Sequence, residues 1–147
     1  SVHWGGNWGL DVPPAHRDFA HALVDEGAAD VVHGHSSHHP LPLEVYQGRL
    51  ILYGCGDLIN DYEGIAPHGS LRADVGCLYF VSLRTGDGAL QALEIVPLRL
   101  RRLRLERAGA AEHAWLQRVF DAGADLGPQP QRGGADGWQL PVRRGAP

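Results

Sequence analysis

The stretch Val31-Val32-His33-Gly34-His35-Ser36-Ser37-His38-His39-Pro40 holds four of the chain's nine histidines. The two β-branched valines are typical of the end of a buried strand. Gly34 permits backbone conformations and close approaches that a Cβ atom would forbid. The histidines are therefore expected on a loop at the carboxyl end of a strand, which is where open α/β sheets bind their ligands.

Histidines gathered in this way favour a metal or phosphate site. Imidazole is the commonest metal ligand in proteins, and two histidines on a short loop can reach one zinc ion at roughly 2.0–2.1 Å. The alternative is a polar surface loop whose histidines face water. The density of histidines directly after a strand and a glycine favours the site over the loop.

Composition limits the class of protein. The 147 residues suggest one domain or a large piece of one, and 44% hydrophobic residues suffice for a core. A net charge of -4 and a pI near 6.1 argue against nucleic-acid binding. No apolar run approaches the roughly 20 residues of a membrane-spanning helix. Cys55 and Cys77 form no CxxC motif, so neither a zinc knuckle nor a disulfide framework is expected.

Hydrophobic periodicity and turn residues predict an α/β fold with hairpins and two amphipathic helices. The predicted helices cover residues 14–26 and 110–122. Strands are expected at 28–32, in hairpins at 43–46 with 49–53 and at 75–84 with 89–98, and as one basic edge strand at 99–107. From Gly127 onward the chain is rich in proline and glycine and is expected to be loosely ordered, with one short strand at 138–142.

The faces of the two helices can also be predicted from the 3.6-residue period. In the first helix, His16 and His21 are expected to face solvent, as is His113 in the second. The apolar faces are expected to comprise Phe19, Ala20, Leu23 and Val24 in the first helix, and Ala114, Trp115, Val119 and Phe120 in the second.

Two further loops carry polar or aromatic groups. The opening His3-Trp4-Gly5-Gly6-Asn7-Trp8-Gly9 is glycine-rich and is expected to line a pocket or cap a core. The loop after residue 56 contains the oxygen donors Asp57, Asn60, Asp61 and Glu63. Such residues often serve only in turns and caps.

Four of these motifs, in this order, resemble the CapA family of capsule or poly-γ-glutamate biosynthesis proteins. The motifs are His3-Trp4-Gly5, Gly34 to His38, Glu44-Val45-Tyr46-Gln47-Gly48, and Leu52-Tyr53-Gly54-Cys55-Gly56-Asp57. The resemblance covers residues 1–125 and leaves 126–147 as a tail. It implies the C-terminal half of a four-layer α/β/β/α sandwich of the calcineurin-like metallophosphoesterase type, with a two-metal site at strand ends.

The resemblance also implies roles for particular residues. His3 corresponds to a metal-site histidine, and Gly34 and His38 match the family's last histidine motif. The middle histidine of that motif falls on Ser36, so His33, His35 and His39 are all candidates to pair with His38, and we expect His35. Trp4, His33, His39 and Asp57, which replaces an asparagine of the family, are expected to serve in catalysis or substrate binding.

The family's aspartate motifs and its Asn-His motif would precede Ser1. We therefore expect this chain to be inactive alone and to need the N-terminal half of the same domain as its partner. The expected cofactors are two divalent ions, with manganese, iron and zinc all compatible with the ligands. Two functions follow: metal-assisted hydrolysis of a phosphoester, or non-catalytic, metal-stabilised binding of an anionic polymer in a synthesis or export apparatus.

Overall fold

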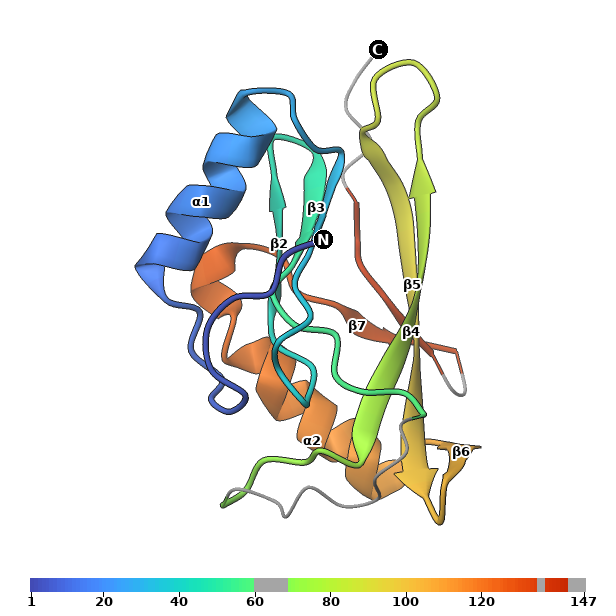
Figure 1. The fold of residues 1–147 in the computed structure, drawn as a ribbon. Coiled ribbons are helices and arrows are strands. Elements are labelled where there is room, and N and C mark those ends of the chain that lie inside the picture. Colours follow the sequence, from blue (N-terminus) through green and yellow to red (C-terminus); the bar gives the residue numbers. More distant parts are fainter. Residues whose placement is uncertain (60–68, 135–136, 143–147) are drawn as a thin grey trace.

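The computed structural model describes residues 1–59, 69–134 and 137–142, and it has the mixed α/β architecture with hairpins and two helices that the sequence predicts (Figure 1). No helix among these residues is long and apolar enough to cross a membrane. The elements in chain order are α1 (Pro14–Asp25), β1 (Val31–His33), β2 (Leu43–Tyr46), β3 (Arg49–Leu52), β4 (Val75–Leu83), β5 (Leu90–Arg101), β6 (Arg104–Arg107), α2 (Ala110–Asp121), the 3₁₀ turn η1 (Ala124–Leu126), β7 (Gln131–Gly133) and β8 (Gly137–Gln139).

The first sheet has the strand order β1-β3-β2. β1 runs parallel to β3, and β2 and β3 form an antiparallel hairpin. The hairpin turns at Gln47 and Gly48, whose φ angles of 48° and 76° are those of a type I′ turn. Outside β1, Val2 forms a parallel bridge with Gly34. The opening residues therefore extend this sheet by one short segment, and α1 connects that segment to β1.

The second sheet is built on the long hairpin of β4 and β5, which continues to β8 and β7, with β6 pairing with the end of β5. Trp138 in β8 has no exposed surface. The structure therefore places a buried tryptophan and two short strands in the stretch after Gly127. β8 begins one residue before the strand predicted at 138–142.

The core has two parts because β3 presents alternate residues to opposite faces. Leu50 and Leu52 face the second sheet and α2, whereas Ile51 and Tyr53 face α1. Figure 1 shows α1 covering one side of the first sheet while the β4–β5 hairpin lies on the other. β3, the middle strand of this sheet, is thus packed on both faces, and β1 lies beside it.

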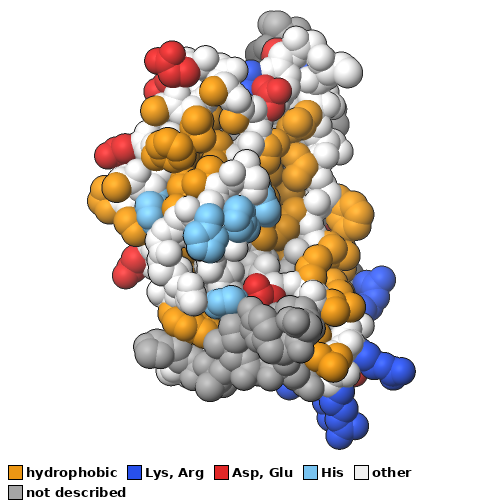
Figure 2. Space-filling view, viewed as in Figure 1, with side chains coloured by type: hydrophobic (Ala, Val, Ile, Leu, Met, Phe, Trp, Pro, Cys, Tyr) orange, Lys and Arg blue, Asp and Glu red, His pale blue; other side chains and the backbone are white. Residues whose placement is uncertain are grey.

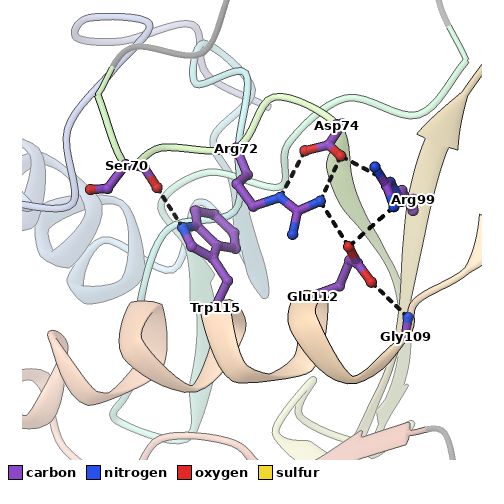
Figure 3. A network of polar contacts seen from close by, with 7 residues as sticks. All are labelled: Ser70, Arg72, Asp74, Arg99, Gly109, Glu112 and Trp115. Atoms are coloured by element: carbon purple, nitrogen blue, oxygen red, sulfur yellow. Dashed lines mark hydrogen bonds and ion pairs between the residues drawn. The ribbon is translucent and has the colours of Figure 1, made fainter.

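A network of charges fixes α2 to the start of β4 (Figure 3). Arg72 donates two hydrogen bonds to Asp74, at 2.9 and 2.7 Å, and lies 2.8 Å from Glu112. Arg99 in β5 contacts the same two carboxylates at 3.1 and 3.6 Å. Glu112 also accepts a hydrogen bond from the Gly109 N–H, which caps the helix.

The structure corrects several predicted positions. His113 is 4% exposed and accepts a hydrogen bond from Trp138 Nε1, so it lies in the core and not on the surface. Ala114 is exposed, and Leu116 is buried in its place. Phe19 is 49% exposed and packs by its edge against Trp4. Periodicity assigns each residue to a face, but the burial of these faces depends on which segments cover them.

Two predicted strands also differ in extent. The strand expected at 28–32 begins only at Val31. Residues 99–107 do not form one edge strand, because the chain reverses at Arg102 and Leu103 and returns as β6. Both residues have φ above 50°, a conformation that neither side chain favours. The alternation of arginine and leucine predicted strand structure correctly but gave no signal for the turn.

We predict that Glu112→Gln lowers the free energy of unfolding by about 2 kcal/mol at pH 7, because it removes a nearly buried charge that two arginines face. Burial raises the pKa of both Asp74 and Glu112. The contacts with Arg72 outweigh this effect at Asp74, and the Gly109 N–H together with Arg72 outweighs it at Glu112, so both pKa values lie below normal. Both carboxylates therefore stabilise the fold above their unfolded pKa of about 4, and this stabilisation is lost as pH falls through the folded pKa values.

Urea unfolding followed by circular dichroism from pH 7 to pH 3 measures this effect. The difference between wild type and Glu112→Gln should shrink below pH 4. Glu94→Gln, which changes an exposed carboxylate of β5, serves as the control and should unfold like the wild type. A Glu112→Gln variant as stable as wild type at pH 7 would show that the network contributes no net stability.

Candidate functional site

The opening segment pairs with the end of β1 through backbone hydrogen bonds. The Val2 N–H donates to the His33 carbonyl at 2.8 Å, and the His35 N–H donates to the Val2 carbonyl at 3.1 Å. In an extended chain, residues two apart point to the same side. Ser1 and His3 therefore come to lie beside His33 and His35, although more than 30 residues separate them in the sequence.

These side chains form one cluster, which we call the histidine cluster: Ser1, His3, His33 and His35. The ring centroids of His3 and His35 are 5.3 Å apart, and those of His33 and His35 are 5.8 Å apart. Figure 2 shows histidine side chains gathered on one face of the molecule, bordered by apolar side chains. His3 and His35 are exposed and His33 is half-buried, so the cluster is open to solvent.

Ser1 links two of the three rings. Its hydroxyl lies 3.0 Å from Nδ1 of His33 and 2.9 Å from Nδ1 of His35. A hydroxyl has one hydrogen, so it donates to one ring and accepts from the other. When both rings are neutral, the ring that donates through Nδ1 presents a free lone pair at Nε2. Burial, followed by the charge of His35, lowers the pKa of His33, which keeps that ring neutral at pH 7.

Trp4 holds the opening segment in place from the opposite side of the strand. Its indole N–H donates to the Tyr53 carbonyl at 2.9 Å, and its ring stacks on His16 at 5.0 Å and on Tyr53 at 5.7 Å. Its backbone exchanges hydrogen bonds with the Ser36 hydroxyl. Trp4 therefore anchors the site, and its expected contact with substrate stays a prediction. His16 is half-buried under this ring, contrary to its predicted exposure.

A second set of contacts surrounds His38. Its Nδ1 lies 2.9 Å from Asp57 Oδ2, and its ring lies 5.8 Å from that of Trp8. Because a carboxylate only accepts, Nδ1 carries the proton and Nε2 is left as the acceptor in the neutral ring. A carboxylate that orients a histidine in this way is typical of metal ligands and of general bases. The contact unites two residues that the sequence analysis selected separately.

His39 lies in the interior and differs from its neighbour. Its ring has no exposed surface and lies between Trp8 and Trp115, and Nδ1 donates to the Pro40 carbonyl at 2.9 Å. Its Nε2 has no hydrogen-bond partner among the described residues. Burial is the main reason that the pKa of His39 is lowered. A neutral imidazole with this orientation packs in the core, and its predicted role in substrate binding stays untested.

The predicted pair of His35 and His38 is divided between these two sets. His35 contacts His3 and His33, whereas His38 contacts Asp57 and Trp8. Within residues 1–59, 69–134 and 137–142, no group of three or more histidine, cysteine, aspartate or glutamate side chains is arranged to hold an ion. Whether His38 reaches the same ion as His35 therefore stays a prediction. Asn60, Asp61 and Glu63 lie outside the described residues.

One buried polar group was missed in the sequence. Glu44 in β2 is 5% exposed and accepts hydrogen bonds from the Tyr53 hydroxyl at 2.6 Å and from His21 at 3.0 Å, with Arg17 3.6 Å away. His21 also stacks on Tyr46, so its predicted exposure is wrong. Alternation along a strand places a glutamate between two apolar residues on the solvent side, so local spacing predicts exposure and does not reveal the partners on α1.

The sequence of this chain is similar to those of known bacterial proteins. Residues 1–62 match the family model described as bacterial capsule synthesis protein PGA_cap. A Mycobacterium tuberculosis protein named "Probable polyglutamine synthesis accessory protein" is 48% identical over 121 residues, which are 82% of this chain and 32% of that protein.

Two further relatives carry the name CapA. The "Capsule biosynthesis protein CapA" of Bacillus anthracis is 30% identical over 100 residues, covering 68% of this chain and 22% of the relative. The "PGA biosynthesis protein CapA" of Bacillus subtilis is 39% identical over 59 residues, covering 40% and 15%. The chain thus spans about a third or less of the length of the curated relatives it matches.

We predict that Gly34→Ala separates the opening segment from β1. A Cβ atom at residue 34 would clash with the Tyr53 carbonyl and with the indole N–H of Trp4. Overpacking of this kind should lower the free energy of unfolding by about 1–3 kcal/mol. Gly86→Ala is the matched control, because its Cβ would meet nothing within 4 Å and its φ is not positive. Urea unfolding compares the two, and equal stability of both variants would contradict the close packing at Gly34.

Proposed function

Because the chain belongs to the CapA family of bacterial capsule synthesis proteins, we propose that it serves as an accessory component in making a capsular or glutamyl polymer. We propose further that its histidine cluster supplies imidazole ligands to a divalent cation. The observation that carries this second step is the contact of His3 with His35, which the sequence separates by 32 positions and which pairing of the backbone brings together.

The spacing of His3 and His35 suits one shared ion. In an imidazole bound at 2.0–2.1 Å, the ring centroid lies about 3 Å from the ion, so two such rings have centroids roughly 5 Å apart. The observed separation is 5.3 Å. The Ser1 hydroxyl contacts Nδ1 of His35 and leaves Nε2 as the ligand atom. Hydrogen bonds of this kind at the second nitrogen orient metal-binding histidines.

The cluster cannot by itself hold two ions. Two cations roughly 3.5–4 Å apart need a bridging anionic group, and no carboxylate contacts the histidine cluster within the described residues. The Mycobacterium tuberculosis relative is about three times as long as the segment that it shares with this chain. We propose that the remaining ligands, the bridging carboxylate included, come from sequence beyond this chain.

The arrangement would support hydrolysis of a phosphoester in the complete protein. A bound cation would polarise the phosphoryl oxygen and stabilise its negative charge. His38, which Asp57 orients through Nδ1, presents Nε2 as a group that can accept and return a proton. Trp8 beside His38 would shield this group from part of the solvent. Manganese, iron and zinc all suit imidazole and carboxylate ligands.

A non-catalytic role is the second candidate. It is supported by the spacing of the His3 and His35 rings, which suits one cation and needs no bridging carboxylate. In that case a bound cation would stabilise the fold and attract an anionic polymer, and no bond would be broken. The relatives' names are compatible with both roles, because they mention synthesis and accessory functions but no reaction.

We predict that the chain binds Mn²⁺ or Zn²⁺ and that His3→Gln/His35→Gln weakens binding at least about 10-fold, since both proposed ligands are lost. Isothermal titration calorimetry measures the affinity. His21→Gln is the matched control, because glutamine still offers Glu44 a donor and the residue lies outside the cluster. His38→Gln tests whether the second set of contacts reaches the same ion. Equal affinities for wild type and the double variant would refute the cation site.

We predict metal-dependent turnover of bis(p-nitrophenyl) phosphate by the complete gene product, loss of turnover in His35→Ala, and none by the 147-residue chain alone. Release of nitrophenolate at 405 nm is the readout, with Mn²⁺, Fe²⁺ and Zn²⁺ each added after dialysis against a chelator. If the complete protein binds metal and yet turns over nothing with any of these ions, the non-catalytic role stands and the hydrolase role is wrong.

A further inference from the structure

The turn between β5 and β6 concentrates positive charge in a chain of net charge -4. Between residues 101 and 107 there are four arginines and a single carboxylate, Glu106. We call this segment the arginine hairpin. Figure 1 shows β6 projecting at one end of the molecule, and Figure 2 shows basic side chains gathered at the same corner. The histidine cluster belongs to a different sheet, so the two features are separate.

The pairing of the two strands places two of these arginines, Arg101 and Arg104, against each other. Arg101 lies directly opposite Arg104, whereas the next charged pair joins Arg99 to Glu106. Like charges at directly opposed positions destabilise a hairpin. In the part of the chain that the structure describes, no ion pair is formed by Arg101 or Arg104. The turn at the other end of β5 differs, because there Arg84 is bound to Asp87.

The apex of the arginine hairpin is unusual in a second way. Arg102 and Leu103 have φ angles of 51° and 57°, where hairpins normally place asparagine and glycine. The β2–β3 turn, by contrast, has glycine at its second position. The Leu103 side chain is 52% exposed at the tip. A strained backbone that displays an apolar residue between arginines points to a role in binding.

We propose that the arginine hairpin docks the protein on an anionic membrane surface, with Leu103 entering the headgroup region and Arg101 and Arg104 contacting lipid phosphates. Arginine binds phosphate oxygens through its planar fork, and basic segments are attracted to anionic lipid. The exposed side chain of Leu103 favours a membrane over a soluble polyanion as the binding partner. Burial of an apolar side chain adds affinity at a lipid surface but adds nothing in a hydrated polycarboxylate.

Sedimentation with sucrose-loaded vesicles tests this proposal with the purified chain. Vesicles of phosphatidylcholine alone are compared with vesicles that contain 30% phosphatidylglycerol (a composition chosen to resemble the roughly −30 to −50 mV of anionic membranes). The chain should bind only the anionic vesicles, and less tightly at high salt. Arg101→Gln/Arg104→Gln should weaken binding about 30-fold. Because the substitution removes like-charge repulsion, this variant should remain folded.

Two more variants separate the contribution of Leu103 to vesicle binding from that of the arginine charges. Leu103→Asn should weaken vesicle binding while keeping the turn, since asparagine accepts a positive φ. Arg49→Gln/Arg84→Gln removes the same charge at positions paired with Asp30 and Asp87, and it should bind like wild type. Soluble polyglutamate is added as a competitor.

The proposal is overturned if anionic vesicles are not bound, or if Arg101→Gln/Arg104→Gln binds them as wild type does. Binding that polyglutamate abolishes and that Leu103→Asn leaves unchanged would assign the arginine hairpin to a soluble polyanion and contradict the membrane role. This test does not involve the proposed metal site. If the membrane proposal fails, the proposed function is therefore unaffected.

Discussion

The candidate site depends on the parallel pairing of residues 1–4 with the end of β1. Two backbone hydrogen bonds, from Val2 to His33 and from His35 to Val2, bring His3 within ring contact of His35. Each bond adds only about 1 kcal/mol, so packing must hold the segment in place. Trp4 does so by its bond to Tyr53 and by stacking on His16. A strand end that is packed on its buried side and open on the other can present side chains in a defined arrangement.

Local contacts at this strand end position the histidines that the proposed chemistry requires. Gly34 lets the indole of Trp4 approach the backbone, and the Ser1 hydroxyl then orients His33 and His35. The pair of His38 and Asp57 comes from the loops that follow β1 and β3, two strands that are parallel neighbours. Carboxyl ends of adjacent parallel strands meet at one sheet edge, and this explains why residues from three of the four motifs lie near that edge.

The sequence predicted those features that depend on local signals. Gln47-Gly48 predicted the first hairpin, and the turn at residues 85–88 predicted the second, because turn residues act within a few positions. It also selected His3, His35, His38 and Asp57. It did not reveal which of them touch, since the contacts depend on register between distant segments. The burial of His113 under Trp138 and of Glu44 beneath α1 has the same cause. The reversal at Arg102 and Leu103 lacks the usual turn residues altogether.

The most direct measurement is a two-dimensional ¹H–¹⁵N spectrum of the imidazole groups, recorded while Zn²⁺ is added to the ¹⁵N-labelled chain. Ring nitrogens that bind zinc shift strongly, and those of other histidines do not. We predict that the Nε2 signals of His3 and His35 shift together and saturate at the same zinc concentration, while His21 stays unchanged. If His3 and His35 respond at different concentrations, or not at all, the two rings do not share a cation.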